Sequence, residues 1–208
     1  MKILVACEES QRVCLAFREK GHEAYSCDII DCSGGHPEYH IMQDVLPLLS
    51  GNCSFKTCDD TQHKIEGKWD MIIAFPPCTN LCNSGTWCFT KGFKPWSLRD
   101  EGAEFFMQFV KADCDKIAIE NPVGCMSTRY RKPNQIIQPY QFGHPETKRT
   151  CLWLKGLPNL KETNNVYKYM MTLPKKERCP VAFASYKKEE RGRMRSKTYP
   201  GVAQAMAD

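Results

Sequence analysis

The 208-residue sequence has no stretch of 18 uncharged apolar residues, so it offers no candidate for a transmembrane helix. It also lacks the pattern of a secretory signal peptide, because its first residues, MKILVACEESQR, include acidic side chains too early. We therefore expect a soluble, cytoplasmic protein without a membrane partner. No internal repeat or low-complexity tract occurs, and the length and the 42% hydrophobic content suit one compact domain.

No two cysteines have the spacing CxxC, and the thirteen cysteines are an odd number. Both features argue against a disulfide scaffold, and we expect most of these thiols to be reduced and buried. A zinc site is an alternative, although Cys27 falls in a predicted strand and we expect no metal. Its ligands would come from Cys27, Cys32, Cys53 and Cys58, with His36, His40 and His63 nearby.

A β-α-β pattern opens the chain, with apolar strands at 2–7 and 23–28 around a helix over 11–21. The inward side of that helix is predicted to carry Val13, Leu15, Ala16 and Phe17. Further strands are predicted at 69–75, 116–122 and 149–156, with helices from Ser97 onward and over 201–207. The order is typical of nucleotide-binding α/β domains and predicts a mostly parallel sheet with helices on both faces and a ligand at the carboxyl ends of the strands.

Two long segments lack a clear period. Residues 32–68 are polar and predicted to be irregular, apart from a short apolar element around IMQDVLPLL. Residues 76–97 read as a long loop rich in Pro, Gly, Asn and Ser, and loops of this length are usually functional. Its aromatic residues could close over a substrate or pack on the core, and both readings stay open. They are Trp87, Phe89, Phe93 and Trp96.

The positive charge is concentrated at the end of the sequence. Residues 161–208 carry 11 Lys and Arg against 5 Asp and Glu, whereas residues 1–160 carry 18 against 19. A basic surface of this kind favours a polyanion such as nucleic acid, and a solvated loop is the plainer alternative. In the run KKEERGRMRSKTY, alternate positions are basic, namely Arg191, Arg193, Arg195 and Lys197.

Two predicted strands end in residues that could do chemistry. MIIAF runs into Pro76, Pro77 and Cys78, and KIAI runs into Glu120 and Asn121. In a parallel sheet, Cys78 and Glu120 would emerge at the same edge. The two prolines make a stiff lead that aims the thiol, although a proline-ended strand with an incidental cysteine is the simpler alternative.

These motifs, in this order, resemble the DNA cytosine-5 methyltransferase family. The segments are AFPPCTNLCNSG, AIENPVG and FGHPETKRTCLWLKG, with a weaker similarity in YPGVAQAMA. The resemblance implies an α/β, Rossmann-like methyltransferase fold, and it covers most of residues 1–156, which would form the methyltransferase-like core. Residues 157–208 would be a short basic C-terminal region with a final helix packed on that core. This is a compact, phage-like form without the family's large target-recognition domain.

The resemblance implies a catalytic set. Cys78 would add to C6 of cytosine, and Glu120 would contact N3 and the exocyclic amine. Asn121 would brace the loop that carries Cys78. Lys148 would keep one basic contact of the family's G-x-P-Q-x-R-x-R stretch, while Arg149 falls in a shifted register. The implied substrate is DNA, duplex or single-stranded, with relaxed specificity.

The resemblance also implies S-adenosylmethionine as the cofactor, bound at the ends of the first strands. Asp28 would hold ribose hydroxyls and Asp44 the adenine amine, although both could instead cap turns. The other implied contacts come from Ala6, Cys7, Glu8, Glu9, Ser10, Ile29, Val45 and Pro76. The family's glycine-rich first loop is replaced by ACEESQRV, where Glu8 and Glu9 could hold the methionine amino group.

Two other functions remain open at this point. The chain could be a catalytically weak or inactive binder of nucleic acid or protein, which the glycine-free first loop favours. It could also modify a free pyrimidine nucleotide by the same thiol addition, which would need no recognition domain.

Overall fold

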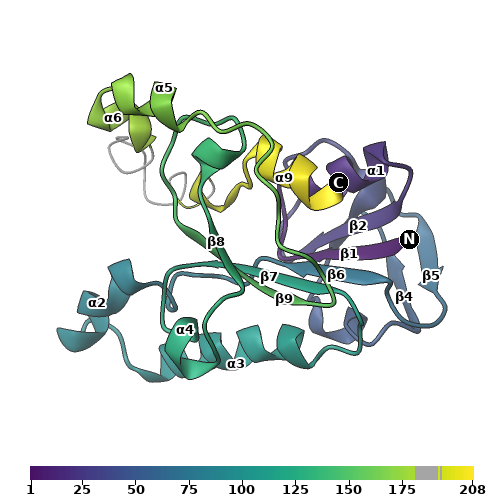
Figure 1. Cartoon of the computed structure of the whole chain (residues 1–208). Coiled ribbons are helices and arrows are strands. Elements are labelled where there is room, and N and C mark those ends of the chain that lie inside the picture. The colour runs from purple at the N-terminus through teal and green to yellow at the C-terminus, as the bar shows by residue number, and fades with distance from the viewer. Residues whose placement is uncertain (181–191, 193) are drawn as a thin grey trace.

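The computed structural model describes residues 1–180, 192 and 194–208. Its centre is a seven-stranded sheet of order β3-β2-β1-β6-β7-β9-β8 (Figure 1). The strands are β1 Lys2–Ala6, β2 Glu23–Asp28, β3 His40–Met42, β6 Met71–Ala74, β7 Ile117–Pro122, β8 Gln135–Ile137 and β9 Thr150–Lys155. The five neighbouring strands β3, β2, β1, β6 and β7 run parallel, and β9 is antiparallel to its neighbours β7 and β8. The predicted Rossmann-like α/β fold is confirmed.

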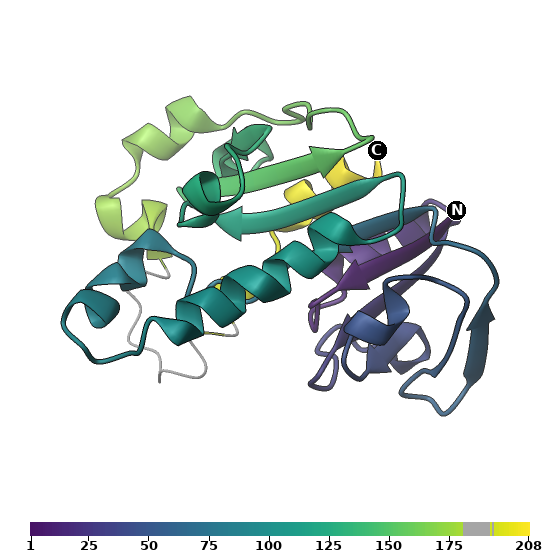
Figure 2. The same cartoon turned by 90° about the horizontal axis from the view of Figure 1, so that it is seen from below.

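Helices cover both faces of the sheet. Helices α1 (Arg12–Glu19) and α9 (Pro200–Ala207) lie on one face, and α3 (Ser97–Lys111) and α4 (Met126–Arg129) lie on the other (Figures 1 and 2). Helices α2 (Thr86–Thr90), α5 (Tyr167–Thr172) and α6 (Lys175–Arg178) lie beyond the carboxyl ends of the parallel strands (Figure 1). No helix among the described residues is long and apolar enough to cross a membrane.

The central strands are apolar on both sides because both of their faces are covered. In β1, the four residues from Ile3 to Ala6 are fully buried. Ile3 and Val5 pack with the side chains of α1 and α9, whereas Leu4 and Ala6 pack with those of α3. This alternation fixes the register of the strand, since a slip by one residue would exchange the two faces.

Several elements differ from the sequence prediction. Residues 32–68 contain β3 and an antiparallel hairpin of β4 (Cys53–Lys56) and β5 (Gln62–Ile65). Short 3-10 turns also occur, at Pro37–Tyr39, Leu46–Leu48, Asn83–Gly85 and Pro139–Gln141. The 76–97 segment contains α2 rather than only loop, and β8 was not predicted. In α1, Cys14 is buried and Leu15 is half-buried, so the buried face of the helix includes Cys14 in place of the predicted Leu15.

The sheet topology marks where a ligand would bind. From β1 the chain moves outward to β2 and β3, and it then returns to the other side of β1 with β6 and β7. In open parallel sheets, ligands bind beyond the carboxyl ends of the strands at such a point of reversal. The segments that follow β1 and β6 therefore border the expected site.

Candidate active site

The segment after β6 forms a rigid elbow. Pro76 is buried, and Pro77 and Cys78 are exposed. The side-chain amide of Asn121, at the end of β7, donates a hydrogen bond of 2.7 Å to the carbonyl oxygen of Pro76. The carbonyl oxygen of Cys78 accepts hydrogen bonds of 3.0 Å from the backbone N–H groups of Leu81 and Cys82, which closes a tight turn. The thiol is therefore held at the start of an ordered turn.

Arg99 of α3 fixes the chain that follows Cys78. Its side chain is buried, and it donates hydrogen bonds to the carbonyl oxygens of Asn80 (2.9 Å) and Cys82 (3.4 Å) and to the hydroxyl of Thr86 (3.0 Å). The guanidinium also lies 4.5 Å from the ring centroid of Phe89. Hydrogen bonds from a buried charged group are among the stronger ones in proteins. One side chain therefore orders the turn and the start of α2.

The charges around Cys78 act in opposite directions. The dense surroundings raise the pKa of the Cys78 thiol, although part of its surface is open to solvent. Cys82 and the carboxylate of Glu120 raise this pKa further, and Lys148 and Arg195 lower it. Burial also raises the pKa of Glu120, against the opposing effects of Lys148 and the Thr150 hydroxyl. The predicted residues Cys78, Glu120 and Lys148 are thus electrostatic neighbours.

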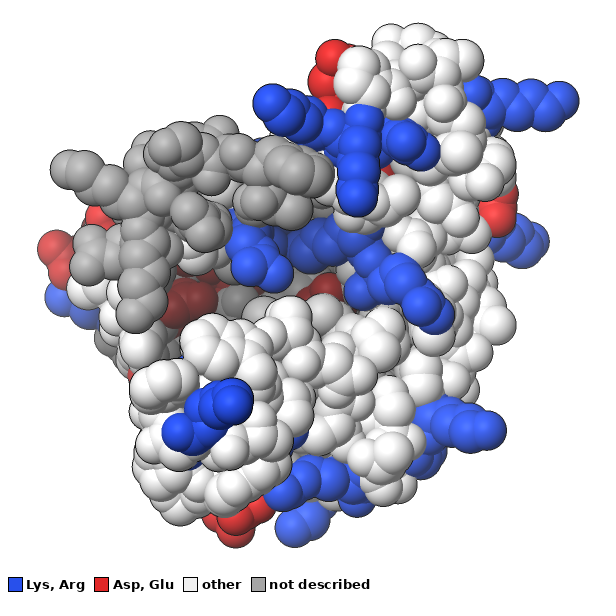
Figure 3. Space-filling view, turned by 90° about the vertical axis from the view of Figure 1, so that its left-hand side faces the viewer, with Lys and Arg blue, Asp and Glu red and all other residues white. Residues whose placement is uncertain are grey.

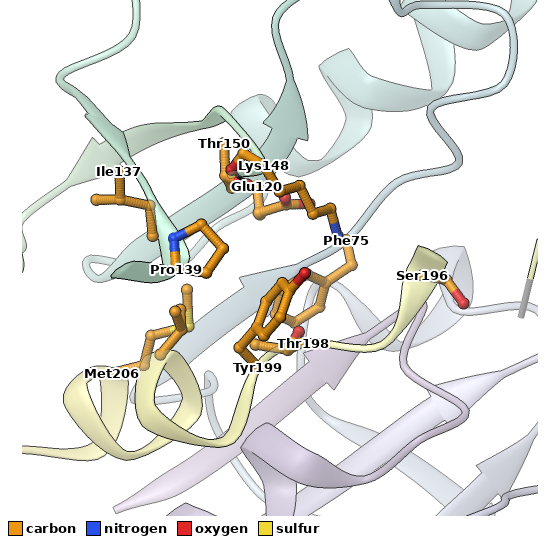
Figure 4. Close-up of a pocket in the computed structure, with 11 residues that line it drawn as sticks. Phe75, Glu120, Ile137, Pro139, Lys148, Thr150, Ser196, Thr198, Tyr199 and Met206 are labelled. Carbon is orange, nitrogen blue, oxygen red and sulfur yellow. Dashed lines mark hydrogen bonds between the residues drawn. The ribbon is translucent and has the colours of Figure 1, made fainter. Parts of the chain in front are cut away.

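A small cavity lies beside Glu120. Glu120 of β7, Thr150 of β9 and Lys148, which precedes β9, approach it from one side (Figure 4). Phe75 and Tyr199 face them from the other side. The rest of the lining comes from Ile137, Pro139, Ser196, Thr198, Val202 and Met206. Its volume is about 20 Å³, which is enough for about one water molecule.

The segment 195–199 roofs this cavity and is fastened at three points. We call it the C-terminal strap. Lys148 donates a hydrogen bond of 2.7 Å to the carbonyl oxygen of Arg195, and Arg12 donates one of 2.7 Å to that of Thr198. The ammonium of Lys197 donates one of 3.0 Å to the hydroxyl of Ser33. The strap therefore joins the loop after β2, helix α1 and the residues before β9. Arg191 and Arg193 of the basic run lie outside the described residues.

The turn after β1 adopts glycine-like backbone angles without containing glycine. Cys7 and Gln11 have φ of 59° and 58°, in the left-handed region. Gly34 provides the close approach instead, since a Cβ there would lie 2.6 Å from the Cβ of Gln11. The side chain of Gln11 exchanges two hydrogen bonds with the backbone of His36, of 2.8 and 3.1 Å.

Glu8 stabilises the start of α1. Its two carboxylate oxygens accept hydrogen bonds from the backbone N–H groups of Val13 (2.7 Å) and Cys14 (3.1 Å). These are unpaired donors of the first helical turn, so Glu8 acts as a cap from outside the helix. Burial raises the pKa of Glu8 to about 7. Each oxygen of Glu8 thus already accepts one hydrogen bond from α1, and the expectation that Glu8 could hold a ligand's amino group stays a prediction.

The adjacent Glu9 differs from Glu8. Its side chain is also buried, but neither carboxylate oxygen has a hydrogen-bond partner among the described residues. Asp28, at the end of β2, is a neighbour, because the Glu9 charge contributes to raising the pKa of Asp28, after the larger effect of burial. The edge between β1 and β2 therefore carries two carboxylates whose charges interact.

The other predicted cofactor contacts are placed as follows. Ala6 is buried within β1, Ser10 is buried in the turn, and Cys7 is half-buried with a raised thiol pKa caused first by burial. Ile29 is 76% exposed next to Asp28. Asp44 is exposed and accepts a hydrogen bond from the backbone of Leu46 with one oxygen, whereas the side chain of Val45 belongs to the core. Val45 can thus offer only its backbone.

The carboxyl edge of the sheet forms a hollow in the surface. In Figure 3, Lys and Arg side chains line its upper wall, and acidic side chains are visible inside it. Trp87 and Phe93 of the α2 region are 59% and 72% exposed and contact each other edge to face. Phe89 is buried instead, so the aromatic residues of this segment divide between core and surface.

The proposed zinc ligands do not form a metal site. Cys27 is buried in β2 and Cys53 begins β4. Within residues 1–180, 192 and 194–208, no group of three or more His, Cys, Asp or Glu side chains could hold a metal ion.

Sequence reasoning missed Arg99, Phe75 and Tyr199. Arg99 occupies the first turn of a predicted amphipathic helix, where a charged residue is expected to face solvent. Tyr199 reaches the cavity from the far end of the chain, and its hydroxyl donates a hydrogen bond of 2.6 Å to Glu146. Phe75 was visible as the last residue of its predicted strand, but no pattern marked it as part of a pocket.

Comparisons with known proteins give weak similarities of fold. No protein family and no curated protein sequence matches the chain. A putative DNA modification methyltransferase encoded within a prophage (E. coli) superposes with a TM-score of 0.41 and 14% identity, over 73% of this chain and 45% of that one. The Entamoeba histolytica methyltransferase EhMeth superposes with a TM-score of 0.46 and 12% identity, over 78% of this chain and 57% of that one. The S. pombe Dnmt2 methyltransferase superposes with a TM-score of 0.44 and 13% identity, over 83% of this chain and 55% of that one. This chain matches about half the length of each structure.

Proposed function

We propose that this chain is an S-adenosylmethionine-dependent methyltransferase that acts on C5 of cytosine in DNA. The observation that carries the proposal is the meeting of Cys78 with Glu120 and Lys148 at the carboxyl edge of the sheet, with Asn121 bound to the elbow before the thiol. These residues come from the motifs that resemble the DNA cytosine-5 methyltransferase family. The basic wall of the hollow supports a polyanionic substrate (Figure 3).

The raised pKa of Glu120 suits an addition to cytosine, and Lys148 and Arg195 favour the thiolate of Cys78. A protonated Glu120 can donate a hydrogen bond to N3, which makes C6 more electrophilic. The sulfur of Cys78 then bonds to C6, the electron pair of the C5–C6 double bond moves to C5, and the thiol proton passes to water. After C5 is methylated, loss of its proton and departure of the Cys78 thiolate restore the ring.

The residues beyond β1 and β2 fit S-adenosylmethionine. The donor would supply an electrophilic methyl group. Asp28 has carboxylate capacity for hydroxyl groups, Ile29 offers an exposed apolar side chain for a purine, and Glu9 has two unpaired oxygens for a cation. The orphaned oxygens of Glu9 are the strongest indication, because a buried carboxylate without a partner is costly.

The small volume of the cavity leads us to propose that a base enters by displacing the strap. A cavity of about 20 Å³ cannot hold a pyrimidine, and the strap is fastened by the same Lys148 that faces Glu120. Phosphates of bound DNA would compete for the basic groups that hold the strap. Extruding a base from a duplex costs a few kcal/mol, and an unpaired base avoids that cost.

The test is transfer of a labelled methyl group from S-adenosylmethionine to duplex DNA, single-stranded DNA or dCMP. We expect label in cytosine of DNA with the wild-type protein and none with Cys78→Ser. Cys88→Ser is the matched control, since that thiol lies in α2. DNA containing 5-fluorocytosine should trap a covalent adduct at Cys78. Label in dCMP alone would support the nucleotide enzyme instead, and binding of DNA without transfer to any substrate would support the inactive binder.

A further inference from the structure

Glu9 is a buried carboxylate whose oxygens have no hydrogen-bond partner in the described part of the chain. The residue is 6% exposed, and neither Oε1 nor Oε2 accepts a hydrogen bond from any described residue. Burying an unpaired carboxylate costs several kcal/mol, so such groups in native proteins usually have a partner or a function. Glu8 beside it shows the alternative, because both of its oxygens are bound to the start of α1.

The backbone around Glu9 keeps the carboxylate in place. The carbonyl oxygen of Glu9 accepts a hydrogen bond of 2.9 Å from the backbone N–H of Ser33. Two residues later, Gln11 is joined to His36 by two hydrogen bonds and packs against Gly34. The turn is therefore fastened to the loop after β2, and Glu9 cannot reach solvent by a simple movement of its backbone.

The nearby cations have other partners. The guanidinium of Arg12 donates a hydrogen bond to the carbonyl oxygen of Thr198, and the ammonium of Lys197 donates one to the hydroxyl of Ser33. The charge of Asp28 interacts with that of Glu9 and adds a second negative charge, besides Glu8. The two free oxygens thus lie in a region of negative charge at the ligand-binding edge of the sheet.

The composition of this region favours an organic cation over a metal. No group of three or more metal-binding side chains forms among the described residues. A primary ammonium needs fewer charged ligands than a metal ion, because its three N–H groups can donate to one buried carboxylate and to nearby carbonyl oxygens. The turn after β1 lies at the point of reversal of the sheet, next to Asp28 and Ile29, where the proposed methyl donor would lie.

We propose that Glu9 binds the α-ammonium group of the methyl donor's amino-acid portion and thereby selects ligands that carry this group. The proposal rests on the proposed function. It gives the acidic turn ACEESQ a role that glycine would not supply: the carboxylate contributes a charge-assisted hydrogen bond in place of close backbone approach.

The test compares two ligands that differ in the amino-acid portion. S-adenosylhomocysteine carries the ammonium, and 5′-methylthioadenosine has the same adenosine and a thioether without it. Binding is measured by calorimetry for the wild type, for Glu9→Gln and for the control Glu19→Gln, which changes an exposed carboxylate on α1. We expect Glu9→Gln to lower the affinity for S-adenosylhomocysteine by about tenfold or more and to leave the affinity for 5′-methylthioadenosine unchanged.

The outcomes separate the two proposals. Equal losses for both ligands, or no loss for either, would overturn the role of Glu9 while the proposed cofactor stands. If the wild-type protein binds neither ligand, the proposed function fails, and this inference fails with it. A melting temperature raised by Mg²⁺, Mn²⁺ or Ca²⁺ in the wild type but not in Glu9→Gln would assign the carboxylate to a metal. Glu9→Gln without ligand should melt no lower than the wild type, which shows that the variant folds.

Discussion

The side-chain amide of Asn121 ties the end of β7 to the elbow before Cys78 through its 2.7 Å hydrogen bond to the carbonyl oxygen of Pro76. Asn121 is buried, and the oxygen of its side-chain amide, Oδ1, has no hydrogen-bond partner among the described residues. The bond couples two strands that are already neighbours in the sheet, just beyond Ala74 and Ile119, the last residues at which they pair with each other. It sets the direction in which the elbow leaves the sheet.

Replacing Asn121 with alanine should therefore affect catalysis more than binding. We expect methyl transfer to fall by about 10-fold to 100-fold, because a displacement of about 1 Å at the nucleophile can cost that much. Affinity for S-adenosylhomocysteine should change little. Steady-state kinetics and calorimetry measure the two quantities. A loss of ligand affinity as large as the loss of rate would contradict the positioning role.

The opposing charges at Cys78 predict two variants with opposite effects. Glu120→Gln removes a charge that raises the thiol pKa, and Lys148→Met removes one that lowers it. At pH 8, alkylation of Cys78 by iodoacetamide should become roughly 2- to 5-fold faster in the first variant and slower by a similar factor in the second. Mass spectrometry of the peptide that contains Cys78 measures the rate, and Cys78→Ser identifies the signal. Changes in the same direction would refute the arrangement.

Glu8 predicts a dependence of stability on pH. Its folded pKa of about 7 lies above the ordinary value of 4.5, so the folded state binds more protons between these two pH values. Stability should thus fall as pH rises from about 4.5 to 7 and change no further above 7, by on the order of 3 kcal/mol. In Glu8→Gln this fall should be absent. Urea denaturation across this range measures it, with Glu19→Gln as control; identical curves for the wild type and Glu8→Gln would exclude the effect.

Arg99 predicts a local loss of order. Lysine cannot reproduce the three hydrogen bonds of the guanidinium, so Arg99→Lys should destabilise the protein by about 2 kcal/mol. Hydrogen exchange should accelerate first between residues 79 and 90. Arg129→Lys is the matched control on the same side of the sheet, because its exposed ion pair with Asp100 should contribute less than about 1 kcal/mol. Uniform acceleration over all elements would argue against a local clamp.

The exposed aromatic residues of the α2 region predict a contact with unpaired bases. Stacking on such a side chain contributes about 1–3 kcal/mol per base, so Trp87→Ala and Phe93→Ala should each weaken binding to single-stranded DNA by this order. The melting temperature should stay unchanged, since both side chains are exposed. Fluorescence anisotropy with labelled oligonucleotides measures the affinity. If neither variant binds DNA more weakly, these residues do not contact the substrate.

The sequence predicts the parts of the fold that depend on local periodicity. The β1-α1-β2 unit, the central strands β6 and β7, and helices α3 and α9 lie within a residue or two of the expected bounds. The hairpin β4–β5 was missed because its strands, CSFK and QHKI, are polar and are joined without a Gly-containing turn. Strand β8 has three residues and pairs only with β9, so tertiary contacts define it.

The candidate site also has parts that the sequence predicts and parts that only tertiary contacts define. The electrostatic interaction of Cys78 with Glu120 could be predicted, because β6 and β7 are parallel neighbours and these residues lie at or just beyond their carboxyl ends. The different roles of Glu8 and Glu9 could not be predicted, because the sequence shows only two adjacent acidic residues of the same type. Only the direction of each side chain decides which one caps α1. The strap joins Arg12 and Ser33 to residues more than 160 positions later, and no local pattern reports a contact of that kind.

The left-handed backbone of Cys7 and Gln11 changes what a sequence comparison can detect. A search that requires glycine in the turn after β1 passes over this chain, although the backbone there bends as glycine would allow. The required small residue has moved to Gly34, in a separate loop. Nucleotide-type domains could thus exchange the identity of the turn residues for a compensating glycine elsewhere, and a search for such pairs of positions would find chains that a contiguous motif cannot.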